Sequence, residues 1–205
     1  MALPEPPLLV VTDRRQARAP LEAVAAALFA AGGRWLLLRE KDLAPLERIA
    51  VLQRLCALGR AQGATIMVSA DLQAARVAGA AGVHLPAGAD PVAARRELGA
   101  GALIGCSAHS LIEAARAEDG GADYVTLSPI FESASKPGYG PALGLDGLRA
   151  AAAELHLPVL ALGGIGPDDV AGCRRVGAAG VAVMGGVMRA EDPGAALHGY
   201  LAAMT

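Results

Sequence analysis

The pentapeptide GAAGV occurs twice in this sequence, at residues 79–83 and again at residues 177–181, half a chain apart. In both places it leads from a helix-length stretch into a short apolar run, and the related segment GGADYV at residues 120–125 does the same. Such repetition is typical of a (β/α)8 barrel, which is assembled from similar strand–helix units. It favours the barrel over a doubly wound open sheet, the other architecture built from such units. Chance recurrence of Gly-Ala turns in an Ala-rich chain is the alternative, and the number of predicted strands would still favour the barrel.

Eight short apolar runs are spaced along the chain, and each is nearly continuous instead of alternating with polar residues. Parallel strands that are covered on both faces show this pattern. Between the runs, apolar residues recur three and four positions apart, which predicts amphipathic helices. The sequence therefore predicts an α/β fold, a single-domain (β/α)8 TIM barrel over residues 1–205. Its predicted strands are residues 8–12, 35–38, 65–68, 82–85, 102–106, 124–127, 159–162 and 181–184.

Composition limits the classes of partner that the chain could bind. The formal net charge is −2 at pH 7, and the aromatic residues are one Trp, three Tyr and two Phe. A protein that binds nucleic acid needs a cationic surface and uses aromatic side chains to stack on bases, so we expect no nucleic acid partner.

The sequence also predicts the compartment. No apolar run approaches the ~20 residues of a membrane span, so we expect no membrane partner, and the N-terminus lacks an export signal. The three cysteines are widely separated and lack metal-ligand spacing, which predicts reduced thiols. They are Cys56, Cys106 and Cys173. We therefore expect a cytoplasmic protein that acts on a small molecule.

Active sites of such barrels lie at the carboxyl ends of the strands, and phosphate commonly binds after the seventh and eighth strands. Glycine lets backbone N–H groups approach an anion, and the N-terminus of a following helix adds a favourable dipole. Both predicted strands end in glycine-rich turns, although tight strand–helix connections alone would also use glycine. The predicted phosphate-binding residues are Gly163, Gly164, Met184, Gly185 and Gly186.

Charged and polar residues follow two other predicted strands. Arg39 and Lys41 follow the second strand, and because residues two apart share a face, both can point at an anion while Glu40 faces away. A solvated run of surface charges is the alternative. Ser107 and His109 follow the fifth strand. Imidazole titrates near pH ~6.5 and can accept or donate a proton, so His109 is the candidate catalytic group, unless it only caps a helix.

Residues 128–141, SPIFESASKPGYGP, form a connection longer than the usual 4–6 residues. The hydroxyl groups of Ser133 and Ser135 are candidate substrate donors, and Lys136 is a candidate cation. Because this segment follows the sixth predicted strand, it lies at the same end of the barrel as the glycine turns. It is predicted to close over a ligand, with a surface loop of no functional role as the alternative.

Together these segments resemble the thiamin phosphate synthase and TenI superfamily of (β/α)8 barrels. The order and spacing of the matching motifs agree over essentially the whole chain. The motifs are VTDR (11–14), LLREK (37–41), GVHL (82–85), GCSAHS (105–110), GADYV (121–125), SPIFESASK (128–136), GGI (163–165) and GAAGVAVM (177–184).

The resemblance implies one of two activities. The synthase joins a pyrimidine methyl pyrophosphate to a thiazole phosphate, releasing pyrophosphate with magnesium. The TenI-type tautomerase isomerises a thiazole carboxylate phosphate to its aromatic form without metal. By resemblance, the thiazole phosphate would lie at Gly164, Met184 and Gly185, with Ser133 and Ser135 nearby. The pyrophosphate of the synthase would be bound by Arg39, Lys41, Ser107 and Lys136.

The magnesium positions of the synthase are not matched. The resemblance expects Asn-Asp after the third strand, where this chain has Ser69-Ala70, and Gly-Gln-x-Asp where it has residues 86–89, PAGA. Mg²⁺ is usually bound by one or two carboxylates plus substrate phosphates. Asp71 and Asp90 lie one position away, and a shift of one residue along a strand reverses the side chain. We therefore expect no metal site, and no cofactor unless the chain is a synthase.

Three functions remain open. The preferred prediction is a TenI-type, metal-independent thiazole tautomerase, an isomerase in which His109 moves a proton. The alternatives are a magnesium-dependent thiamin phosphate synthase and a non-catalytic protein that binds thiazole phosphate. The expected partner is a small phosphorylated thiazole in each case, and the Ala-rich exterior is compatible with a homodimer.

Overall fold

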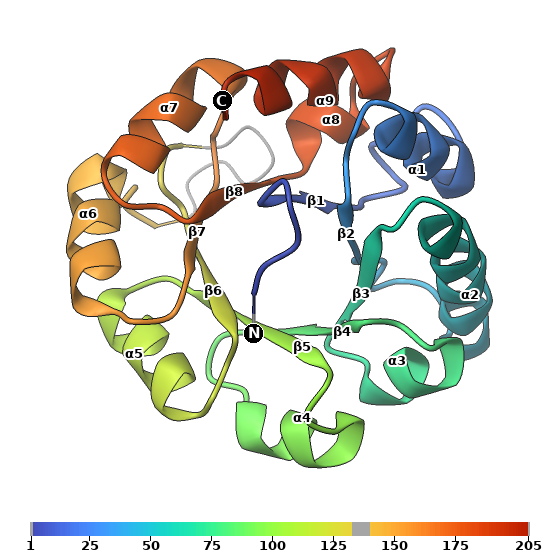
Figure 1. Ribbon diagram of the computed structural model, residues 1–205, viewed down its shortest axis with the longest axis horizontal. Helices are drawn as coiled ribbons and strands as arrows, with labels where there is room; N and C mark the ends of the chain where they lie inside the picture. The colour runs from blue at the N-terminus through green and yellow to red at the C-terminus, as the bar shows by residue number, and fades with distance from the viewer. Residues whose placement is uncertain (1, 133–139, 205) are drawn as a thin grey trace.

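The computed structural model describes residues 2–132 and 140–204, which form a closed barrel of eight parallel strands (Figure 1). Each strand pairs with the next one along the chain, and β8 pairs with β1 to close the barrel. The helices surround the strands on the outside. The predicted (β/α)8 TIM barrel is confirmed.

Strands and helices alternate along the chain. The strands are β1 (Leu8–Val11), β2 (Trp35–Leu38), β3 (Thr65–Ser69), β4 (Gly82–Leu85), β5 (Leu103–Ala108), β6 (Tyr124–Leu127), β7 (Val159–Leu162) and β8 (Gly180–Val183). The helices are α1 (Leu21–Ala30), α2 (Pro45–Ala61), α3 (Leu72–Ala78), α4 (Pro91–Leu98), α5 (Leu111–Asp119), α6 (Gly144–Glu154), α7 (Pro167–Arg175), α8 (Gly185–Met188) and α9 (Pro193–Ala202).

The repeated GAAGV segment makes the same turn in both halves of the barrel. Its first glycine has a positive φ in each copy, +65° at Gly79 and +107° at Gly177. The N–H of its second residue donates to a carbonyl oxygen of the preceding helix, as Ala80 does to Ala75 at 2.9 Å. The N–H of its third residue donates to the preceding strand, as Ala81 does to Ile66 at 2.8 Å. Residues 121–123 repeat the same two bonds before β6. The motif is therefore the helix-to-strand turn of this barrel.

The fourth residue of the motif must be glycine because the next strand lies against it. A Cβ atom on Gly82 would overlap the carbonyl group of Leu103 in β5, and one on Gly180 would overlap that of Pro7 before β1. The repeat thus marks the same close approach of two backbones at two places, between β4 and β5 and between β8 and β1, where the barrel closes.

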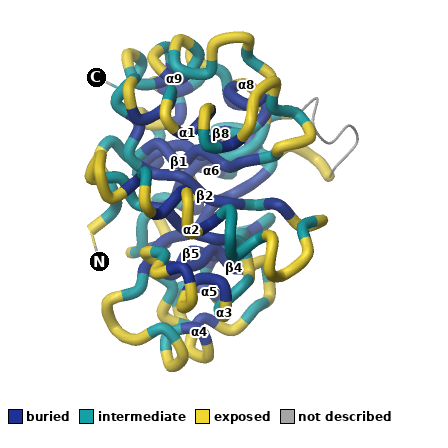
Figure 2. Tube along the Cα trace, turned by 90° about the vertical axis from the view of Figure 1, so that its right-hand side faces the viewer, coloured by how far each residue is buried: buried dark blue, intermediate teal, exposed yellow. Residues whose placement is uncertain are grey.

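The core has two layers, because successive residues of each strand face opposite sides of the sheet. One set of strand residues packs against the helices, and the other fills the barrel interior, where the Trp35 and Tyr124 rings meet edge to face at 4.9 Å between centroids. Figure 2 shows the buried strands at the centre and the exposed outer surfaces of the helices. The interior set is Leu9, Val11, Trp35, Leu37, Met67, Leu103, Tyr124, Leu160 and Ala182.

One strand boundary differs from the prediction in a way that matters for the site. β5 continues to Ala108, so Ser107 lies within the strand and pairs in register with Thr126 of β6. The prediction ended this strand at residue 106 because the apolar run ends there. Backbone pairing continues past that point, and it fixes Ser107 more firmly than a loop would.

Two further observations concern the whole chain. The thiols of Cys56, Cys106 and Cys173 are buried and free, and burial raises the pKa of Cys106 to about 12. None of the helices in the described ranges is long and apolar enough to cross a membrane.

Candidate active site

A buried polar cluster lies above the apolar interior, at the carboxyl ends of β4, β5 and β6. Nδ1 of His84 is 3.1 Å from the Tyr124 hydroxyl, and its Nε2 is 3.0 Å from Oγ of Ser107 and 3.3 Å from Oγ1 of Thr126. Burial, and after it the positive charge of Arg39, lowers the pKa of His84 to about 4. His84 is therefore neutral at pH 7 and holds the Ser107 hydroxyl in place.

His84 should make the stability of the protein depend on pH. Its folded pKa of about 4 lies below the unfolded value of 6.5, so the unfolded chain binds more protons between these values and stability falls as the pH falls. From pH 7 to pH 5 we expect the free energy of unfolding to drop by about 2 kcal/mol. Denaturant unfolding at pH 7 and at pH 5 gives this change in the free energy of unfolding for wild type and for His84→Asn. An equal change in both proteins would contradict the low pKa of His84.

Glu40 fixes the segment that carries Arg39 and Lys41. Its side chain is only 3% exposed, and its carboxylate accepts hydrogen bonds from Oγ1 of Thr12 at 2.6 Å and from the N–H of Arg14 at 3.1 Å. The N–H of Arg39 donates to the same Thr12 oxygen at 3.0 Å. Glu40 is therefore buried and not part of a solvated run of surface charges, whereas Lys41 beside it is exposed. That Arg39 and Lys41 point at an anion stays a prediction.

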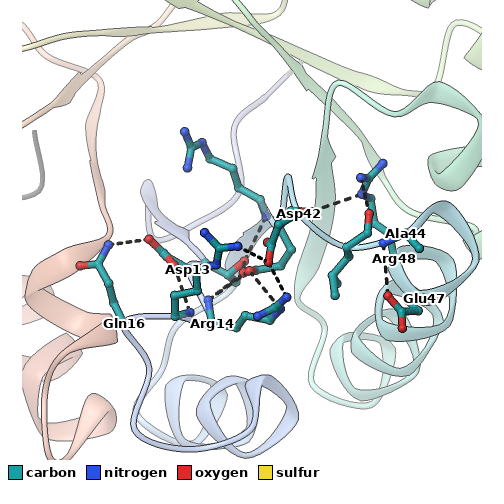
Figure 3. A network of polar contacts seen from close by, with 12 residues as sticks. Asp13, Arg14, Gln16, Asp42, Ala44, Glu47 and Arg48 are labelled. Carbon is teal, nitrogen blue, oxygen red and sulfur yellow. Dashed lines mark hydrogen bonds and ion pairs between the residues drawn. The ribbon is translucent and has the colours of Figure 1, made fainter.

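A cavity of about 550 Å³ opens beside this segment, between the carboxyl ends of β2 and β3. Lys41 lines it, as does Arg48 from the first turns of α2. The Arg48 side chain forms an ion pair with Asp71, 2.6 Å between Nη1 and Oδ2. It also donates to the carbonyl oxygens of Glu40 and Leu43, in the polar network of Figure 3. The lining residues are Leu38, Glu40, Lys41, Arg48, Ser69, Ala70, Asp71 and Leu72.

Arg48 is a site residue that the sequence reasoning missed. It lies in a helical stretch that holds other charged residues, 23 positions before its partner Asp71 in the chain, so no spacing pattern marks it. Only the folded barrel brings the start of α2 next to the end of β3. His84 is not singled out by the sequence either, because it lies inside the apolar run GVHL, where a histidine is more often an ordinary core or rim residue.

The glycine turns after β7 and β8 are packed against neighbouring segments. Gly163 and Gly164 have φ values of +98° and +67°, and a Cβ on Gly164 would lie 2.8 Å from the carbonyl carbon of Phe131. Gly185 begins α8, with the Arg189 guanidinium against it. These turns lie at the carboxyl ends of adjacent strands, but packing alone already requires glycine at Gly164. The predicted phosphate site stays a prediction.

His109 lies at the end of β5, half-buried. Its Nδ1 is 2.8 Å from the carbonyl oxygen of Ser128, which can only accept, so Nδ1 carries the hydrogen. The carboxylate of Glu113 accepts the N–H of His109 at 2.7 Å. The bond to Ser128 ties the end of β5 to the chain leaving β6, and the bond to Glu113 ties it to the first turn of α5. The other predicted residues of that connection, Ser133, Ser135 and Lys136, lie outside the described residues.

The side chains at this rim do not fit a magnesium site. Positions 70 and 89 are alanine, and Ala70 is the only non-glycine residue of the described ranges with positive φ, +58°. Asp71 caps α3 and pairs with Arg48, while the exposed Asp90 caps α4. Within the described part of the chain, no group of three or more His, Cys, Asp and Glu side chains could hold a metal ion.

The fold and this rim define a class of protein: a (β/α)8 barrel with a cavity lined by cations and carboxylates and a buried polar cluster at the end of the barrel where such enzymes bind their substrates. Comparison with known proteins gives the family. A family model described as thiamine monophosphate synthase matches residues 8–187, and the chain belongs to that family.

Individual relatives agree over almost the whole chain. The thiamine-phosphate synthase of Roseiflexus sp. (strain RS-1) is 39% identical over 94% of this chain and 84% of its own length. That of Salinispora tropica is 37% identical over 97% of both chains. The solved structure of thiamine phosphate pyrophosphorylase from Pyrococcus furiosus superposes with a TM-score of 0.85 at 31% identity, covering 96% of this chain and 94% of that one.

These relatives correct the functional prediction from the sequence. The preferred prediction, a TenI-type tautomerase, is wrong, because the similar proteins are synthases at 37–39% identity over more than nine-tenths of this chain. The prediction rested on the missing carboxylates at positions 70 and 89. From the absence of these two carboxylates it inferred that the chain does not catalyse the synthase reaction.

Proposed function

We propose that this protein is a thiamine-phosphate synthase, a transferase that joins a pyrimidine methyl pyrophosphate to a thiazole phosphate. A bond forms between the thiazole ring nitrogen and the pyrimidine methylene carbon. The carbon–oxygen bond to the diphosphate breaks, and pyrophosphate leaves with that electron pair. The observation that carries the proposal is the match of the thiamine monophosphate synthase family over residues 8–187. The similar sequence from Roseiflexus and the similar solved structure from Pyrococcus furiosus bear names of the same activity.

The arrangement of the rim suits the charge that develops in this reaction. Negative charge accumulates on the leaving diphosphate, and fixed donors directed at it lower the barrier. Arg39 is close enough to His84 to lower the pKa of that residue, and Ser107 is bonded to the same imidazole. We assign the diphosphate to Arg39, Lys41 and Ser107, together with Lys136, and the thiazole phosphate to the glycine turns after β7 and β8, with Ser133 and Ser135.

The condensation needs no acid–base group to move a proton between carbon atoms, so His109 has no proton-transfer role in this proposal. We propose instead that it positions the chain leaving β6 through its bond to Ser128. His109→Asn is therefore expected to slow condensation by less than about tenfold, below the 10²–10⁴-fold of a catalytic acid or base. Steady-state rates test this, and a loss of a thousandfold in a folded variant would contradict it.

A genetic experiment tests the proposed function. In a bacterium that lacks its own thiamine-phosphate synthase, expression of this chain should restore growth without added thiamine. Growth that still requires thiamine, with the protein present in soluble form, would count against the proposal. A homodimer, suggested by the Ala-rich helices, stays a prediction that sedimentation analysis of the purified protein tests.

A further inference from the structure

We propose that the Arg48 guanidinium binds the diphosphate of the substrate in the cavity between β2 and β3, so that this chain holds and releases pyrophosphate without a divalent cation. The inference rests on the proposed function, because it assigns the diphosphate half of that substrate. It follows from a disagreement: the family resemblance implies magnesium, and the side chains of this rim do not fit it.

Three hydrogen bonds hold the Arg48 guanidinium in place, and they leave two of its N–H groups available to a ligand. Its Nε donates to the Glu40 carbonyl at 3.4 Å, Nη1 to Asp71 at 2.6 Å and Nη2 to the Leu43 carbonyl at 2.8 Å. A guanidinium carries five N–H groups. The two others, one on each Nη atom, make no hydrogen bond within the described ranges. A planar fork of this kind matches phosphate oxygens.

The position of Arg48 suits the ligand. Both Arg48 and Lys41 line the same cavity, whose volume of about 550 Å³ exceeds what one diphosphate needs. The Arg48 and Asp71 side chains are only 19% and 20% exposed, so the ion pair is preformed and partly shielded from water. Partly buried charge-assisted hydrogen bonds to phosphate are among the stronger polar contacts in proteins.

Ala70, which precedes Asp71 in the lining of the cavity, supports the same conclusion. It lines the cavity with a left-handed backbone, φ +58°, a conformation that Asp and Asn adopt more readily than alanine. The turn thus keeps a shape suited to a carboxylate while presenting a methyl group. A carboxylate at this position would need a metal ion between it and a diphosphate, and a methyl group does not. The two carboxylates that do line the cavity are already bonded, Glu40 to Thr12 and Arg14 and Asp71 to Arg48.

Calorimetry with inorganic pyrophosphate tests the proposal, in EDTA and in magnesium. For wild type we expect the two dissociation constants to agree within about threefold. Arg48→Gln should weaken binding at least tenfold in both buffers, in line with the loss of a charge-assisted contact. Binding that requires magnesium in wild type, or that is unchanged in Arg48→Gln, would overturn the proposal.

The partner residue separates the arginine site from a displaced metal site. Asp71→Asn keeps a residue that caps α3 but removes the charge that competes with the diphosphate for Arg48. Pyrophosphate should then bind as tightly as in wild type or up to about tenfold more tightly. If Asp71 were instead a magnesium ligand, the variant would lose binding in magnesium, and that result would also overturn the proposal.

Two further variants complete the test. The first controls for misfolding, and the second should make pyrophosphate binding depend on magnesium. The double variant Arg48→Gln/Asp71→Asn leaves no unpaired charge, and it should fold yet still bind pyrophosphate at least tenfold more weakly. Ala70→Asp should weaken binding in EDTA about tenfold and regain it in magnesium, whereas the matched control Ala70→Asn should not respond to magnesium. A folded double variant with wild-type affinity would contradict the assignment.

The binding measurement does not use the two organic substrates, so the two proposals fail separately. A chain that binds pyrophosphate through Arg48 but forms no thiamine phosphate would overturn the proposed function and support the Arg48 site. A chain that forms thiamine phosphate only with magnesium would support the proposed function and overturn the Arg48 site.

Discussion

Replacing Gly82 by alanine is expected to remove more than about 3 kcal/mol from the free energy of unfolding, or to prevent folding altogether. The added methyl group would overlap the Leu103 carbonyl group in the neighbouring strand, and backbone cannot rotate away as a side chain can. β4 and β5 would have to separate, with loss of the hydrogen bonds that hold them in register.

The same motif supplies the control. A Cβ on Gly79 would meet nothing within 4 Å, so Gly79→Ala adds only the strain of its φ of +65°, about 1 kcal/mol. Urea unfolding of both variants gives the comparison, and Gly180→Ala should behave like Gly82→Ala. Equal losses at Gly79 and Gly82 would show that strand contact is not what requires glycine there.

Arg39→Gln is expected to lower the rate of condensation by about 10²–10³-fold, the usual loss when one fixed donor to a developing negative charge is removed. Arg39 directly follows β2 and lies near enough to His84 to lower its pKa, after burial as the larger cause. Ser107, the other proposed diphosphate ligand, is hydrogen-bonded to the same imidazole. Steady-state kinetics with both substrates measures the loss. A rate within threefold of wild type would remove Arg39 from the diphosphate site.

Two measurements show whether the loss is local. Burial is the larger cause of the low pKa of His84 and the positive charge of Arg39 the smaller one, so Arg39→Gln should raise that pKa only part of the way from about 4 toward 6.5, which imidazole NMR signals report. Arg15→Gln is the matched control, since it removes the same charge from a side chain that is 70% exposed and paired with Asp42. The control should keep the wild-type rate and leave the His84 pKa unchanged.

The sequence predicts this fold well because each strand–helix unit carries its own signals. The two GAAGV copies mark the same backbone turn, and the near-continuous apolar runs mark strands covered on both sides. The end of β5 could not be found in this way, because Ser107 is polar and its place in the strand depends on pairing with Thr126 of another strand.

The site was less predictable, since its parts meet only in the folded chain. Strand spacing singled out Arg39 and Lys41, but the burial of Glu40 between them could not be predicted, because its partners Thr12 and Arg14 lie 28 and 26 positions away. Arg48 gave no signal at all. The missing carboxylate at position 70 was noticed, but Arg48, the cation that we propose for the diphosphate, lies in a helix distant in the sequence and reaches the same cavity only in the folded chain.

The most direct test of the account is the condensation itself. Purified protein is incubated with the pyrimidine methyl pyrophosphate and the thiazole phosphate, and both products are quantified over time. The account predicts thiamine phosphate and pyrophosphate in a one-to-one ratio, with formation of both nearly abolished in Arg39→Gln. Folded wild-type protein that forms neither product, in EDTA and in magnesium alike, would contradict it.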